Sequence, residues 1–319
     1  MVAIMLKHAR QIHTEFGFKK ARFFVLKYLQ FLPHSRRWLS FIEDFYRTYT
    51  QSPPPIEMVR TKFMRSYYSR GLNSSSKLDH LRTHYSVMET FLKPAVIAVL
   101  IKGEDVYLGS VCDKFGTVYD FDICQHERYR AEGEFTLFMR IRGASLALAA
   151  LTFGLGRNDN KQIVMRIGGL QGPQNENAKQ LIIDTTRALY GQRPKALILA
   201  LFYNIAEIFD AERIECVSVK NHPLNNDRHA FLANNDAFWE ENGGTRNGEG
   251  NFDLPRTLPT RVIEAVPAKK RKEWLERQRL KAELSAQASL VFKSWLRESR
   301  ITPDHHFMNS GCHERSNAA

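Results

Sequence analysis

Three glycines and a proline stand close together at residues 168–173, between an apolar, strand-like segment and a segment typical of a helix. Glycine lets the backbone adopt a positive φ and approach a ligand or another strand closely. A helix that begins at such a turn directs free N–H groups toward it, and these groups bind anions. We therefore predict that an anionic ligand is bound by Gly168, Gly169, Gln171 and Gly172. A tight connection without a ligand explains the same pattern.

Basic and polar side chains flank this turn in the sequence. Arg187, Arg193 and Lys195 lie around the next expected helix boundary, and Asn221 follows the next apolar run. An arginine binds a phosphate or carboxylate through two parallel N–H donors. These four residues are therefore candidates for the same anion site. The alternative is that the three cations are solvated at helix ends.

Three further side chains are candidates for acid–base chemistry. Glu132 and Glu134 are two residues apart, so on a strand they share one face, as some general acid–base pairs do. His222 stands at an expected strand end, and histidine is the usual proton acceptor near neutral pH. We favour an exposed strand start for the glutamates and a hydrogen-bonded turn for the histidine, and keep Glu134 and His222 as catalytic candidates.

The composition and net charge of the chain limit the classes of partner that it can bind. The 319 residues carry a formal net charge of +12 and a pI of about 9.6, which attracts anionic molecules. Glutamates interleave with the cations of the basic run at 269–281, which is typical of a solvated helix face, so nucleic acid is not an expected partner. The four cysteines are widely spaced and form no ligand pair, so neither a metal site nor a disulfide framework is expected.

Residues 1–76 are predicted to form a basic helical region. Between Lys7 and Arg70 there are thirteen Lys and Arg residues and four Asp and Glu residues. Prolines separate three expected helices, the third from Glu57 to Arg70. Aromatic residues accompany the cations on more than one face. Two interpretations remain: a helical cap packed on the core, which we favour, or a basic aromatic surface that lies on a membrane.

Residues 77–265 are predicted to form an α+β core. Short segments rich in Val, Ile and Phe alternate with glycine turns, and in 135–141 every odd position is apolar. Local hairpins of this kind predict an antiparallel sheet flanked by helices. Residues 266–300 are predicted to form a charged helix, and residues 301–319 a disordered tail.

No segment is long and apolar enough to span a bilayer, and Lys7 interrupts the apolar start of the chain. Neither a membrane span nor a secretory leader is therefore expected. We expect a cytoplasmic protein, and peripheral contact with the inner membrane stays open.

Several motifs, taken in order, resemble the VirK/YbjX family of Gram-negative bacteria. They are Glu132-Gly133-Glu134, the run 168–173, the stretch 186–196, Ser218 to His222, Phe238-Trp239 with Gly243-Gly244, and Leu254-Pro255. The similarity covers most of residues 30–290. The family has no defined biochemical activity, and its members are linked to virulence, surface-protein display, tolerance of cationic antimicrobial peptides and stress responses. The resemblance therefore implies a bacterial envelope or stress factor.

A second resemblance concerns the fold. Antiparallel strands, a glycine-containing turn, a helix and a strand ending in Asn221 are similar to the Gcn5-related N-acetyltransferases. In those proteins a loop before a helix binds the pyrophosphate of coenzyme A. The resemblance implies an acetyltransferase-like core. The glycine spacing differs from the usual acetyltransferase pattern, Pro173 removes one backbone donor, and an extra helix is expected before the final strand.

Two functions follow as expectations, and the sequence leaves open whether the protein is an enzyme. The first is an acyl- or aminoacyl-transferase that uses a coenzyme A derivative or another phosphate-bearing donor and modifies an envelope component. The second is a non-catalytic accessory factor for surface-protein display, which binds anionic lipid or an acidic partner through its basic helices. The sequence does not determine the substrate or the oligomeric state.

Overall fold

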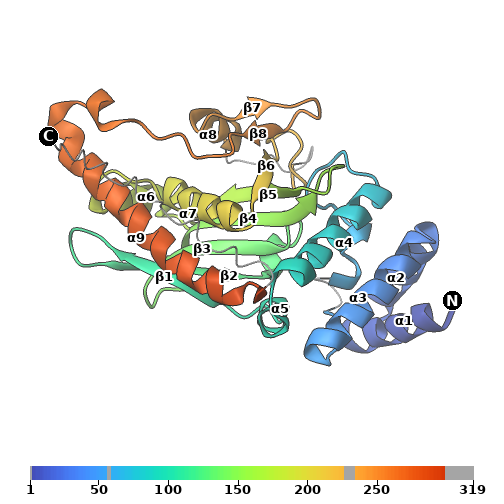
Figure 1. Ribbon diagram of the computed structural model, residues 1–319. Coiled ribbons are helices and arrows are strands. Elements are labelled where there is room, and N and C mark those ends of the chain that lie inside the picture. The colour runs from blue at the N-terminus through green and yellow to red at the C-terminus, as the bar shows by residue number, and fades with distance from the viewer. Residues whose placement is uncertain (1, 56–58, 226–233, 299–319) are drawn as a thin grey trace, which may run out of the picture.

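The computed structural model describes residues 2–55, 59–225 and 234–298 (Figure 1). It shows an α+β protein in which helices flank a single large sheet. The tail predicted at 301–319 lies outside the described residues.

In the described part of the chain, eight strands form the sheet in the order β1-β2-β3-β4-β5-β6-β8-β7. Five of them follow one another as antiparallel neighbours, and among the described strands only β5 and β6 pair in parallel. The predicted antiparallel sheet is therefore confirmed in outline, with one parallel pair as the departure. The strands are β1 (Val106–Cys112), β2 (Val118–Cys124), β3 (Phe135–Ile141), β4 (Ala147–Arg157), β5 (Ile163–Gln171), β6 (Ala211–Cys216), β7 (Thr245–Arg246) and β8 (Phe252–Leu254).

Helices cover one face of the sheet and extend beyond one end of it (Figure 1). Helix α7 packs against β3 to β6, α4 against β4, and α9 against β1 and α7. Helices α1, α2 and α3 lie beyond α4, away from the centre of the sheet. The helices are α1 (Val2–Phe16), α2 (Phe18–Gln30), α3 (His34–Thr50), α4 (Ser74–Phe91), α5 (Pro94–Ile101), α6 (Ala178–Ala188), α7 (Pro194–Ile208), α8 (Asn235–Glu241) and α9 (Arg271–Trp295).

Strand alternation divides the apolar side chains between the two faces of the sheet. Phe153 of β4 faces the helices and packs edge-on against Phe202 of α7, with ring centres 5.2 Å apart. Residues of the opposite parity, including Phe138 and Ala150, form a small second cluster on the other face. The central strand β4 is therefore buried on both sides.

The helix expected at 57–70 does not form in the described part of that range. The structure has a short 3-10 turn at Lys62–Met64, followed by irregular chain. Tyr68 has a φ of 55°, which a helix does not allow, and its N–H donates to the carbonyl oxygen of Ala131 at 2.7 Å. Contacts with a distant segment thus replace the intrahelical hydrogen bonds that the sequence pattern favoured.

Strand β5 continues to Gln171, so the turn predicted at residues 168–173 does not begin at Gly168. Gly169 pairs with Thr152 of β4, and the register shifts at this point so that Gly168 is an extra residue in β5. Such a bulge is typical of strands that are bent beside a functional site. The connection to α6 begins only after Gln171.

The two glycines allow another segment of the chain to approach. A Cβ atom at Gly168 would overlap the carbonyl oxygen of Glu132, and one at Gly169 would overlap the carboxylate of the same residue. Gly133 lies similarly close to β4, since a Cβ atom added there would be 2.7 Å from the carbonyl oxygen of Phe153. The backbone at 132–133 therefore lies directly on β4 and β5, with no room for side chains between them.

The Gly168→Ala variant tests this close approach. We expect it to lower the free energy of unfolding by about 3 kcal/mol or more, because the methyl group meets a backbone oxygen that cannot move aside alone. Gly172→Ala is the matched control, because no atom lies within 4 Å of the added Cβ. Urea unfolding measures both, and equal stability of the two variants would contradict the packing.

Candidate functional site

The parallel strands β5 and β6 separate at their carboxyl ends. They pair as far as Ile167 and Cys216, and the last backbone bond runs from the Val217 N–H to the Ile167 oxygen at 2.9 Å. Beyond that point β5 stays beside β4, whereas the chain after β6 turns into residues 218–225. We call this opening the fork. In open α/β sheets, the place where neighbouring parallel strands diverge is the usual ligand site.

Glu132 lies in the fork and is only 1% exposed. Its Oε1 accepts a hydrogen bond from Gln171 Nε2 at 2.5 Å, and His222 Nε2 lies 3.4 Å from the same oxygen. Glu134 is buried as well. The expected exposed strand start is therefore wrong for both glutamates, because the backbone at 132–133 packs against β4 and β5.

His222 is held in one orientation beside Glu132. Its Nδ1 accepts the Leu224 N–H at 3.3 Å, so in the neutral ring the proton is on Nε2, which faces the carboxylate. The ring is 1% exposed. Glu132 and His222 thus place a carboxylate and an imidazole side by side in a buried position.

Glu134 pairs with a different residue, Lys62. The Lys62 Nζ lies 2.5 Å from Glu134 Oε1 and also donates to the Gly133 carbonyl oxygen at 2.8 Å. Tyr85 of α4 donates its hydroxyl to the other oxygen of Glu134 at 3.1 Å. Burial lowers the pKa of Lys62, and the neighbouring Glu134 carboxylate opposes part of that shift.

A cavity of about 270 Å³ lies beside the Lys62–Glu134 pair, because Lys62 lines it, and we call it the fork pocket. Three segments that are far apart in the sequence form it. Its charged lining residues in the described part of the chain are all cationic. They are Lys62 and Arg65 from the segment after α3, and Arg128 and Arg130 from the segment before β3; Ser66, Ala131 and Leu224 complete the lining.

A chain of side-chain hydrogen bonds joins the fork pocket to Glu132. Arg128 donates to Gln174, Gln174 donates to Gln171 at 3.1 Å, and Gln171 donates to Glu132. A ligand that displaces or orients Arg128 would therefore change the hydrogen bonding of the buried carboxylate. Gln171, predicted as a ligand-binding residue, serves here as the link.

The other predicted ligand-binding residues lie elsewhere. Arg187 is largely exposed and pairs with Asp184 on its own helix at 3.8 Å. Arg193 pairs with Glu241 of α8 at 2.5 Å. These contacts do not bring either arginine to the glycines. The anion site predicted from Gly168, Gly169 and Gly172 also loses its geometry, because Glu132 occupies the space over the first two.

Lys195 and Asn221 hold loops in place. Lys195 donates to Asn235 of α8 at 3.1 Å, and burial, assisted by neighbouring Arg193, lowers its pKa to about 8. Asn221 Nδ2 donates to the Glu249 carbonyl oxygen at 2.9 Å, and the Asn221 carbonyl oxygen accepts the Arg70 N–H at 2.8 Å. Asn221 thereby fixes the segment that carries His222.

Sequence reasoning missed the four cations of the fork pocket. Arg128 and Arg130 lie four and two residues before the motif Glu132-Gly133-Glu134. Their closeness to this motif was the one feature of the sequence that could have identified them. Lys62 and Arg65 gave none, because a helical pattern places them on a solvated face.

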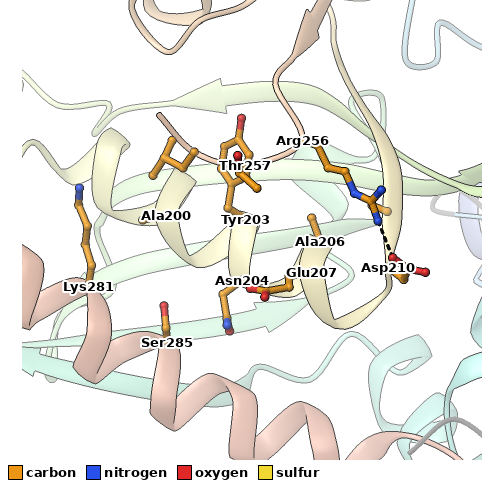
Figure 2. Close-up of a pocket in the computed structure, with 12 residues that line it drawn as sticks. Ala200, Tyr203, Asn204, Ala206, Glu207, Asp210, Arg256, Thr257, Lys281 and Ser285 are labelled. Atoms are coloured by element: carbon orange, nitrogen blue, oxygen red, sulfur yellow. Dashed lines mark hydrogen bonds and ion pairs between the residues drawn. The ribbon is translucent and has the colours of Figure 1, made fainter. Parts of the chain in front are cut away.

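A larger cavity of about 510 Å³ lies between α7, α9 and the segment at 256–258 (Figure 2). Figure 2 shows Arg256 turned toward Asp210, at a distance of 2.7 Å, and Lys281 at the opposite end of the cavity. Tyr203 donates to a backbone carbonyl. Opposite charges are thus mixed in this lining, whereas the fork pocket concentrates one sign beside a buried acid–base pair.

The comparisons with known proteins agree with these motifs. The model of the family described as "Protein of unknown function (DUF535)" matches residues 15–289. The chain belongs to this family. An uncharacterized protein YbjX of Escherichia coli (strain K12) is 26% identical over 234 residues, which cover 72% of this chain and 70% of that protein. An uncharacterized protein of Haemophilus influenzae is 23% identical over 252 residues, covering 78% of this chain and 79% of that one. No solved structure gives a significant match.

His84 of α4 adds a buried titratable group near Lys62. Its Nδ1 accepts the N–H of Leu155 at 3.0 Å, a backbone group that lies beyond the end of the β3–β4 pairing. Burial lowers the pKa of His84 well below its ordinary value of 6.5, and the Lys62 charge lowers it further. The folded protein therefore holds this ring neutral.

The buried pair Lys62–Glu134 predicts a non-additive loss of stability. Lys62→Met should lower the free energy of unfolding by about 3–5 kcal/mol, because it leaves the Glu134 carboxylate buried without its counter-charge. Adding Glu134→Gln removes that uncompensated charge, so the double variant should be more stable than Lys62→Met alone. Chemical denaturation of the unaltered protein, Lys62→Met, Glu134→Gln and the double variant measures the four free energies of unfolding. If the losses in the two single variants simply add in the double variant, the pair does not act as a unit.

His84 predicts a loss of stability in acid. Below pH 6.5 the unfolded chain binds a proton at this histidine and the folded chain does not, so the free energy of unfolding falls as the pH falls toward the folded-state pKa. The slope from one such group reaches about 1.4 kcal/mol per pH unit. His84→Asn keeps an acceptor for the Leu155 N–H and should give a shallower pH dependence in denaturation series between pH 7 and 5. An unchanged slope would contradict the prediction.

Proposed function

We propose that this chain binds a phosphate-bearing donor in the fork pocket and transfers an acyl or aminoacyl group from it. The observation that carries the proposal is a pocket lined by the four cations Lys62, Arg65, Arg128 and Arg130. Two further lining residues connect it to the buried Glu132–His222 pair, since Ala131 precedes Glu132 in the chain and the Leu224 N–H donates to His222. Anion binding and proton transfer are the two requirements of this reaction.

The cations support a phosphate-bearing donor. Arginine binds phosphate oxygens through a planar fork of donors, and burial strengthens such contacts because water competes less. Pockets for drug-sized molecules usually measure about 300–1,000 Å³. With about 270 Å³, the fork pocket accommodates the charged end of a donor such as a coenzyme A derivative, and the remainder of that donor would lie outside it.

The transfer step needs one proton to move. The acceptor's amine or hydroxyl gives its proton to the Glu132–His222 pair while its nitrogen or oxygen bonds to the carbonyl carbon of the donor. The bond from that carbon to the sulfur or oxygen of the donor then breaks, and the leaving group takes the proton.

The fold supports the same class of reaction. The antiparallel strands and the parallel strand β6 that separates from β5 are the features that support an acetyltransferase-like core, whereas the second helix between β5 and β6 departs from that fold. The acceptor would be an envelope component, which is the role that the family resemblance implies. A fold alone does not define an activity, so the fork pocket carries the proposal.

The Arg128→Gln/Arg130→Gln variant tests the binding half. We expect coenzyme A and inorganic pyrophosphate to bind the unaltered protein in titration calorimetry, and the double variant to bind at least about tenfold more weakly, since each charge-assisted contact contributes about 1.5–3 kcal/mol. Arg142→Gln is the control, because Arg142 is exposed at the far end of β3 and pairs with Asp120. Equal affinity in all three proteins would contradict the assignment of the fork pocket.

His222→Asn tests the transfer half. This variant should bind the probes within about twofold of the unaltered protein and lose acyl transfer to amine acceptors by about 100-fold or more, since general acid–base groups contribute factors of that size. Retained binding shows that the variant folds. Full transfer activity in the variant would exclude the acid–base role. Binding without any transfer by the unaltered protein would favour the non-catalytic accessory factor.

A further inference from the structure

A second surface, remote from the fork, lies on the helical hairpin of α1 and α2. The two helices are joined at Gly17 and enclose a groove of about 560 Å³ on their outer side. The groove residues recur three and four positions apart on each helix, so they form one continuous stripe per helix. They are Leu6, Ala9, Arg10, His13 and Thr14 of α1, and Phe18, Ala21, Arg22, Val25 and Leu26 of α2.

The outer side of this hairpin exposes large apolar side chains. Phe18 is 67% exposed, Leu26 56% and Leu29 55%. Phe24 and Tyr28, on another side of α2, are buried and pack α2 against the rest of the protein. The exposed residues are therefore additional to the core. Apolar groups gathered in this way on a soluble surface usually mark a contact site.

Cations accompany the apolar groove. From Leu6 to Leu29 the chain has six Lys and Arg residues and one acidic residue, Glu15. Arg10 and Arg22 line the groove itself. Their aliphatic stems can lie along apolar surface while the guanidinium groups extend to a charged layer.

This combination fits an anionic lipid surface. An interfacial helix inserts Phe and Leu at the boundary of the acyl chains, while Lys and Arg contact the anionic headgroups, each contributing about 1 kcal/mol. A second copy of the chain would bring like charges together in the contact. Among the described residues no helix is long and apolar enough to cross a bilayer, so the contact would be peripheral.

We propose that the outer side of the α1–α2 hairpin, centred on Phe18, Arg22 and Leu26, docks on anionic lipid bilayers. The hairpin lies at one end of the molecule beyond α3, away from the sheet (Figure 1). This inference rests on the hairpin alone and does not depend on the proposed transferase activity.

Vesicle co-sedimentation tests the docking. The unaltered protein should bind vesicles of phosphatidylglycerol and phosphatidylcholine at low salt, and bind pure phosphatidylcholine vesicles at least about tenfold more weakly. Phe18→Ser/Leu26→Ser should reduce binding at least about tenfold. Arg10→Gln/Arg22→Gln should weaken it and flatten its dependence on salt.

Leu275→Ser/Leu290→Ser is the matched control, because these leucines are comparably exposed but lie on α9. It should bind as the unaltered protein does. Binding unchanged by Phe18→Ser/Leu26→Ser, or equal on both kinds of vesicle, would overturn the proposal. So would sedimentation velocity showing a dimer that Phe18→Ser/Leu26→Ser dissociates, because a second copy would then cover the groove.

Discussion

The contact between residues 132–133 and the backbone of β4 and β5 is the constraint on which the site depends. Gly133, Gly168 and Gly169 remove the side chains that would otherwise hold these segments apart. The bulge at Gly168 adjusts the register of β5 to the same contact. Because the segment lies so close, the Glu132 carboxylate is placed inside the fork rather than in water.

The fork and the fork pocket gather polar groups from three distant parts of the sequence. The segment after α3 supplies Lys62 and Arg65, the segment before β3 supplies Arg128 and Arg130, and the chain after β6 supplies His222. Backbone bonds from Tyr68 to Ala131 and from Arg70 to Asn221 tie the first segment to the other two. A buried carboxylate is costly unless it is paired, so these segments must assemble together for Glu132 and Glu134 to be stable.

The sequence predicted the elements better than the site. Alternation in 135–141 and the glycine turns around it are local signals, and the hairpin strands follow from them. The glycine run was ambiguous between approach of a ligand and approach of another strand, and the structure shows a chain segment there. The burial of Glu132 could not be predicted. Alternation along a strand indicates which residues lie on the same face of the sheet, but it does not indicate what packs on that face. The helix expected at 57–70 failed for a related reason, because long-range hydrogen bonds outweighed a local periodicity.

The hydrogen-bonded chain Arg128–Gln174–Gln171–Glu132 would couple an anion bound in the fork pocket to His222. The most direct measurement is a nitrogen-15 NMR titration with inorganic pyrophosphate that follows the arginine Nε and histidine ring signals. We expect saturable shifts of the Arg128 and Arg130 signals together with the ring of His222, and no shift of Arg142. Saturable shifts confined to other arginines, with the His222 ring unchanged, would exclude this coupling.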